Sequence, residues 1–148
     1  MEQNLVNEQS DVKKEIIETF ASGKELCKNL ISDLDATVEA YQMNEKKSAS
    51  EVFDEQLSVT QSLMAALYTL QMVAEKDLRL KNASRSQSGL WDETEMSFKL
   101  SLNAMLKAFG HEDFIGLADI IDDEFRASLQ SWGNYIRKVE TSYINGSV

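Results

Sequence analysis

Apolar residues recur at intervals of three, four and seven along most of the chain, a spacing that places side chains on one face of an α-helix. The first such stripe predicts a helix over about residues 11–46, with Ser10 or Asp11 as its N-cap. Gly23 lies inside this stripe and indicates a place where a neighbouring helix comes close. Residues 1–10 are expected to be flexible or to form a short helical turn. The stripe consists of Val12, Ile16, Phe20, Cys27, Leu30, Leu34, Val38 and Tyr41.

A second helix is predicted over about residues 50–80, after a polar break at 46–50 in which Ser48 or Ser50 would be the N-cap. It carries two apolar stripes, which together cover more than the usual one-sided apolar arc of a surface helix. One stripe is Phe53, Leu57, Met64, Leu67 and Leu78, and the other is Val59, Leu63, Ala66, Leu70 and Val73.

Residues 81–89 are small and polar and end in a glycine, which predicts a loop. A shorter third helix follows over about 89–109, with Ser88 as N-cap and Gly110 as the stop signal. The fourth helix is predicted over about 112–143, and Gly116 is expected to mark a kink or a short separate turn near its start. Residues 145–148 would form a tail.

Four amphipathic helices with short connections predict an all-α fold. We expect one domain over residues 11–144, an antiparallel up-down-up-down four-helix bundle with long helices 1, 2 and 4 and a shorter helix 3. The absence of proline agrees with this, because proline breaks helix interiors. This topology would gather five residues at one end of the bundle as an aromatic core layer: Phe20, Leu78, Trp91, Trp132 and Tyr135.

The chain has a net charge of −10, from 25 acidic and 15 basic residues. This charge argues against binding to nucleic-acid phosphates or anionic membranes, which need a basic patch, and favours basic protein partners. A polar start and a single cysteine predict a cytoplasmic protein. The longest uncharged run, residues 56–74, has seven Gln, Ser or Thr among its 19 residues, so it is too polar to span a membrane.

Few residues are suited to catalysis or metal binding. His111 and Cys27 are the only histidine and cysteine, whereas a di-iron bundle needs two Glu-x-x-His motifs and a zinc site needs several such ligands. We expect His111 in an exposed loop and Cys27 in the core. Four acids lack the alternating order of a calcium-binding loop and are expected on a solvated helix face: Asp119, Asp122, Asp123 and Glu124. The sequence thus predicts no cofactor, no metal and no enzymatic activity.

One face of the second helix is small and uncharged where a surface helix would hold Lys, Glu or Arg. We call it the neutral face; it consists of Ser58, Gln61, Ser62, Ala65, Thr69 and Met72. Depletion of charge distinguishes the core of a protein–protein contact. We therefore expect this helix to be shielded from solvent around most of its circumference. Either a partner covers the neutral face, or residues 81–89 or the N-terminal segment of the same chain do.

These patterns predict a non-enzymatic protein–protein interaction module of the helical-bundle chaperone or adaptor type, which acts through the neutral face. The partner would be a second copy, giving a homodimer, or an amphipathic helix docked beside the second helix. Small acidic bundles of this kind resemble bacterial export and flagellar chaperones at the level of fold. The alternative is an acidic regulator that mimics nucleic-acid charge and occupies a basic partner. The interspersed bases Lys13, Lys14, Lys24 and Lys28 count against that alternative.

Overall fold

The computed structural model describes residues 2–146, with side chains from residue 8 onward, and every element in this range is helical. The all-α prediction is therefore confirmed. The elements are α1 (Glu2–Gln42), α2 (Lys46–Ala74), α3 (Leu78–Ser86), α4 (Ser88–Gly110), α5 (Phe114–Ile120), the π-helical segment η1 (Ile121–Phe125) and α6 (Arg126–Asn145).

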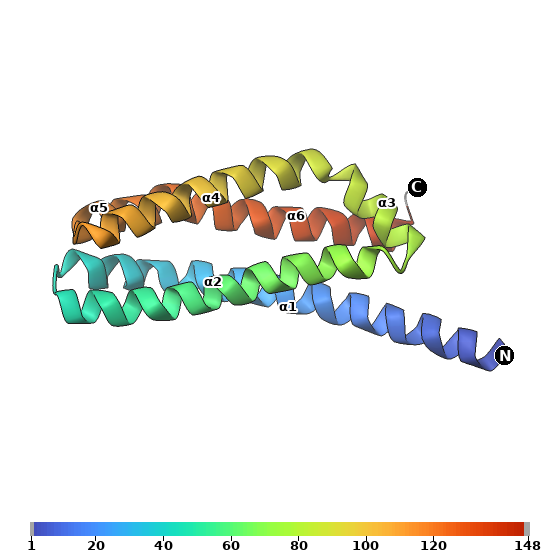
Figure 1. The fold of residues 1–148 in the computed structure, drawn as a ribbon. Coiled ribbons are helices and arrows are strands. Elements are labelled where there is room, and N and C mark those ends of the chain that lie inside the picture. The colour runs from blue at the N-terminus through green and yellow to red at the C-terminus, as the bar shows by residue number, and fades with distance from the viewer. Residues whose placement is uncertain (1, 147–148) are drawn as a thin grey trace.

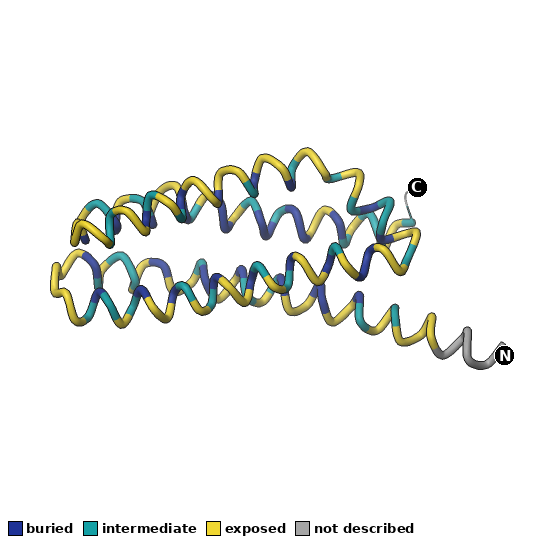
Figure 2. Tube along the Cα trace, viewed as in Figure 1, coloured by how far each residue is buried: buried dark blue, intermediate teal, exposed yellow. Residues whose placement is uncertain are grey.

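Helices α1 and α2 form an antiparallel hairpin, and α4 lies beside the rod formed by α5, η1 and α6 (Figure 1). Helix α1 connects the two pairs, because it packs against α2, α5, η1 and α6. The buried positions recur along the inward sides of these helices, while the outward sides are exposed (Figure 2). The helices thus enclose one core that runs the length of the molecule.

Part of the predicted aromatic layer is present at the end of the molecule near α3. The ring centroid of Trp91 lies 4.8 Å from that of Trp132 and 5.2 Å from that of Tyr135. Phe20 instead pairs with Tyr143, at 6.0 Å. The placement of Leu78 in this layer is wrong, because Leu78 begins α3 and is 74% exposed.

The N-terminal boundary differs from the prediction. Helix α1 runs without interruption from Glu2, so residues 2–10 continue the long helix and neither Ser10 nor Asp11 is an N-cap. It ends at Gln42, because Asn44 adopts a left-handed conformation with φ of 57°. Gly23 does mark a close approach: a Cβ there would lie 3.0 Å from Cδ1 of Ile136 in α6.

The segment between the second and third predicted helices is also different. Helix α2 begins at Lys46, before Ser48 and Ser50, and ends at Ala74, and α3 occupies most of the predicted loop over 81–89. The Asp77 side chain caps α3 by accepting a hydrogen bond from the Leu80 amide at 2.9 Å. This cap and the burial of Leu80 and Ala83 outweigh the low helix propensity of the Ser- and Asn-rich segment.

The predicted helix over 112–143 is divided. Asp113 caps the short helix α5 by accepting a hydrogen bond from the Gly116 amide at 2.9 Å, and a Cβ at Gly116 would collide with that carboxylate. Between α4 and α5 the residue with a left-handed conformation is Glu112, with φ of 58°. Gly110, the predicted stop signal, does not adopt this conformation. Helix α6 ends at Asn145, inside the predicted tail, and Gly146 follows in a left-handed conformation. Residues 147–148 of that tail lie outside the described residues.

Candidate protein-binding surface on helix α2

The neutral face of α2 is open to solvent along its whole length. All six of its residues are exposed: Ser58, Gln61, Ser62, Ala65, Thr69 and Met72. Neither α3 nor the described part of the N-terminal segment covers them. The explanation that this chain buries its own neutral face is therefore wrong for residues 8–146. The shielding that we expected around most of the helix is likewise not supplied within these residues.

The hydroxyl groups of this face are largely satisfied within the helix. The Ser62 hydroxyl donates to the Ser58 carbonyl at 3.3 Å, and the Thr69 hydroxyl donates to the Ala65 carbonyl at 2.7 Å. Because these donors already have acceptors, covering the face would not leave them unpaired. Two of the three hydroxyl groups of the neutral face would therefore keep their hydrogen bonds if a partner covered it, whereas the Ser58 hydroxyl and the Gln61 amide would need partners of their own.

The spacing of this surface suits contact with another helix. Five of its residues follow one another at alternating steps of four and three, the spacing of a coiled-coil seam. Small side chains along such a seam allow two helix axes to approach closely. The five residues are Ser58, Ser62, Ala65, Thr69 and Met72.

One edge of the neutral face is fixed to α4 by aromatic side chains. The Tyr68 ring meets Trp91 edge-on at 5.9 Å, and its hydroxyl donates to the Glu95 carboxylate at 3.3 Å. Near the other end of α2, Phe53 stacks on Phe109 with ring centroids 4.2 Å apart. These contacts hold α2 in place from its inner side, so the neutral face is presented on a supported helix.

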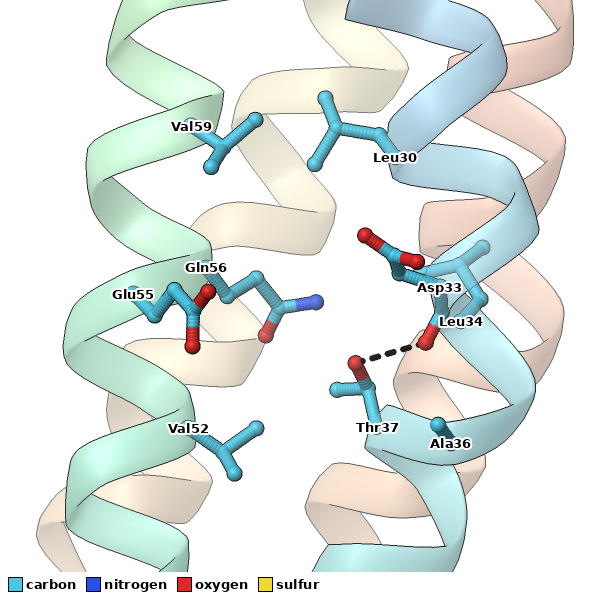
Figure 3. A pocket seen from close by; sticks show the side chains of 9 residues that line it. All are labelled: Leu30, Asp33, Leu34, Ala36, Thr37, Val52, Glu55, Gln56 and Val59. Atoms are coloured by element: carbon cyan, nitrogen blue, oxygen red, sulfur yellow. Dashed lines mark hydrogen bonds between the residues drawn. The ribbon is translucent and has the colours of Figure 1, made fainter.

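The other edge borders a groove between α1 and α2 with a volume of about 340 Å³. The carboxylates of Asp33 on α1 and Glu55 on α2 face each other across it (Figure 3). Its remaining walls are mostly apolar and comprise Leu30, Leu34, Ala36, Thr37, Val52 and Val59. The groove thus combines an apolar lining with two negative charges.

A polar side chain lies at the base of this groove. Gln56 is only 6% exposed, and its Oε1 accepts a hydrogen bond from the Tyr41 hydroxyl at 3.1 Å. Its amide nitrogen points into the groove toward α1 and has no acceptor among the described residues (Figure 3). Burial, together with the charge of Asp54, raises the pKa of Tyr41, so this hydroxyl stays protonated at neutral pH.

A family model with the description "Domain of unknown function (DUF8042)" matches residues 18–135. The chain belongs to the DUF8042 family. The matched range includes all of α2 and both walls of the groove, so the neutral face lies within the family's domain. No curated protein and no solved structure matches the chain.

Cys27 and His111 of the DUF8042 chain lie where the sequence predicts them. Cys27 is 3% exposed, and burial raises the pKa of its thiol to about 11. A thiol that remains protonated is a poor nucleophile, so Cys27 acts as a small core residue at neutral pH. His111 is exposed and follows the last residue of α4.

The predicted acidic face is solvated. Asp119, Asp122, Asp123 and Glu124 are all exposed. Arg126 pairs with Asp122 at 2.9 Å and with Asp35 of α1 at 2.7 Å. Within the described residues, no three His, Cys, Asp or Glu side chains lie close enough together to hold a metal ion. None of the helices described is long and apolar enough to cross a membrane.

The groove of the DUF8042 domain was not predicted from the sequence. The burial of Gln56 is detectable in the sequence, because Gln56 lies one turn from Phe53 and Thr60 on the buried side of α2. No sequence signal pairs Asp33 with Glu55, since that pairing depends on how α1 and α2 align. The exposure of two apolar side chains of α4 was also not predicted: Met96 is 68% exposed and Leu100 is 64% exposed. Leu100 borders a hollow between α4 and α6.

Proposed function

We propose that the DUF8042 chain is a non-enzymatic protein-binding module of the chaperone or adaptor type that receives an amphipathic helix on the neutral face of α2. In this proposal its working form is an antiparallel bundle of four rods (α1, α2, α4 and α5–η1–α6) in the cytoplasm. The helix comes from a second copy or from another protein. One observation carries the proposal: an uncharged surface lies exposed on a helix whose opposite side is buried through Leu63, Leu67 and Leu70.

The charge of the chain favours a basic partner. The neutral face adjoins exposed acids at the start of α2, namely Glu51, Asp54 and Glu55. With a net charge of −10, the molecule attracts positively charged proteins, which speeds their encounter, whereas a second copy carries the same charge and must associate through the neutral face against that repulsion. Small residues then provide the close contact, and charge provides partner selection.

The alternative proposal, an acidic mimic of nucleic acid, has weaker support. Such a surface needs acids without intervening bases, whereas basic side chains pair with acids at several places. Lys24 contacts Glu140 at 2.8 Å, Lys46 contacts Glu112 at 2.7 Å, and Arg126 contacts Asp35 at 2.7 Å. The affinity of a mimic for its partner would fall steeply as the salt concentration rises, whereas the affinity for a partner held mainly by the neutral face would change little.

Size-exclusion chromatography with light scattering tests the proposal. Ala65→Glu places a charge in the middle of the neutral face, and Ala21→Glu makes the same change at an exposed position of α1. We expect the wild type and Ala21→Glu to form a dimer at high concentration and Ala65→Glu to remain a monomer. A wild-type monomer at every concentration would exclude the second copy as the source of the helix. Equal behaviour of the two variants in association would contradict a role for the neutral face.

A further inference from the structure

We propose that a pocket between α1 and α6 binds a small carboxylate with an apolar body, whose carboxyl group pairs with Arg137 and Lys28. The pocket has a volume of about 370 Å³, and its described lining residues all belong to α1 and α6. The inference therefore does not depend on the neutral face of α2 or on the proposed function. It adds a small-molecule site on another side of the molecule.

The pocket is basic, although the chain as a whole is acidic. Lys24, Lys28 and Arg137 line it, and its described lining includes no acid. Lys24 is already paired, because its ammonium group donates to both carboxylate oxygens of Glu140, at 2.8 and 3.0 Å. Lys28 and Arg137 form no ion pair with any residue that the structure describes. In a chain with 25 acids and 15 bases, these two bases leave a local positive charge that an anion from solution can neutralise.

The glycine at position 133 provides the space for a ligand. Gly133 is buried within α6, where glycine is less favourable than alanine. Close packing of helices explains Gly23, where an added Cβ would meet Ile136, but not Gly133. The three atoms nearest to a Cβ at Gly133 all belong to the Arg137 guanidinium, at 3.4, 3.8 and 3.9 Å. The guanidinium therefore lies back along α6 over the glycine, and the missing side chain leaves the pocket open beside it.

The lining favours a carboxylate with an apolar body. The planar guanidinium of Arg137 suits a carboxylate held through two parallel hydrogen bonds, and the Lys28 ammonium group supplies a second positive charge. The Ile31 side chain and the buried thiol of Cys27 line the same pocket. Apolar walls with a few polar groups are typical of small-molecule sites. Inorganic phosphate has no apolar part to cover these walls, and a neutral molecule lacks the charge to pair with the two cations.

Nuclear magnetic resonance titration of the full chain with benzoate, a carboxylate with a small apolar body, tests this site. We expect saturable shifts of the Arg137 Nε–H group and of the Cys27 and Gly133 backbone amides. The neutral analogue benzamide and inorganic phosphate should each bind at least about tenfold more weakly, because a lost charged hydrogen bond or lost apolar burial reduces affinity by this much. No saturable shift at these groups, or equal binding of benzamide or phosphate and benzoate, would overturn the inference.

Variants at the pocket complete the test. Lys28→Gln combined with Arg137→Gln should weaken benzoate binding at least about tenfold. The matched pair Lys13→Gln with Lys107→Gln removes the same charge at exposed positions elsewhere and should leave the affinity unchanged. All four positions are exposed, so both variants should fold, which circular dichroism checks. The same affinity in the pocket variant and the wild type, or an equal loss in both variants, would refute specific pairing.

Thermal unfolding provides a second readout. A ligand that bridges α1 and α6 binds the folded chain and raises the midpoint of unfolding. We expect benzoate to raise the midpoint of the wild type and of the matched pair but not of the pocket variant. Ala65→Glu, which changes the neutral face, should respond as the wild type does. An equal rise in the pocket variant and the wild type would contradict the site.

Discussion

The buried thiol of Cys27 makes the stability of the chain depend on pH in a way that one substitution removes. Burial raises the pKa of this thiol from an ordinary 9.0 to about 11. The folded state therefore holds the thiol proton more tightly than the unfolded chain does. The stability that this group contributes is fully present below pH 9 and is lost as pH rises through 11.

The size of the loss follows from the two pKa values. At pH 10 the unfolded thiol is mostly ionised while the folded thiol is mostly protonated, so ionisation favours unfolding by about 1.3 kcal/mol relative to pH 8. Near pH 11 the loss reaches about 2.3 kcal/mol. Tyr41 and Tyr135, which are buried, and Tyr143, which is partly buried, also have raised pKa values, and they weaken the fold as pH rises past their ordinary pKa of 10.0. That contribution is common to the wild type and to Cys27→Ala.

The assay is urea unfolding of both proteins under reducing conditions at pH 8, 9 and 10, followed by circular dichroism. Cys27→Ala should be less stable at pH 8, because it leaves a small gap in the core. The stability difference between the two proteins should shrink by about 1.3 kcal/mol on going to pH 10. A difference that stays constant with pH would show that the thiol ionises freely, and the packing of α1 against α6 around Cys27 would be refuted.

Three further substitutions test the packing of the fold by thermal or urea unfolding. Asp77→Ala should cost about 1 kcal/mol by removing the cap of α3, whereas Asp77→Asn should cost much less; equal losses would contradict the cap. Gly23→Val should lower the free energy of unfolding by about 1–3 kcal/mol, because a Cβ at position 23 would lie 3.0 Å from Ile136. Adding Ile136→Val should restore part of this stability. Additive losses in the double variant would contradict the close approach. Trp132→Ala should cost about 3–5 kcal/mol, since Trp132 is fully buried against Trp91 and Phe98, and a loss below about 1 kcal/mol would rule out that packing.

The third predicted helix agrees most closely with the structure, because its start and stop signals, Ser88 and Gly110, lie in the sequence itself. Residues 89–109 were predicted as a helix, and α4 spans Ser88–Gly110. The prediction failed where tertiary contacts decide the structure. Residues 81–86 read as a loop from composition alone, but burial of Leu80 and Ala83 against neighbouring helices makes them part of α3. The exposure of Leu78 has the same origin, because helix α2 ends before it.

The candidate site was predictable in part. Missing charge identifies the neutral face of α2 from the sequence, because that signal lies within one helix. Whether the chain covers this face depends on where α3 and α1 pack, which a local pattern does not record. The groove is less predictable still, since Asp33 and Glu55 meet only through the alignment of the α1–α2 hairpin. The left-handed turn at Asn44 helps to set that alignment.

Photo-cross-linking in the native cell tests most directly whether the neutral face is a contact surface. A benzophenone amino acid would replace Ala65 and, in a separate strain, the exposed Ala21 of α1. We predict a discrete cross-linked species from position 65, identified by mass spectrometry as a second copy or one defined protein, and none from position 21. No species from position 65, or the same species from both positions, would contradict the account.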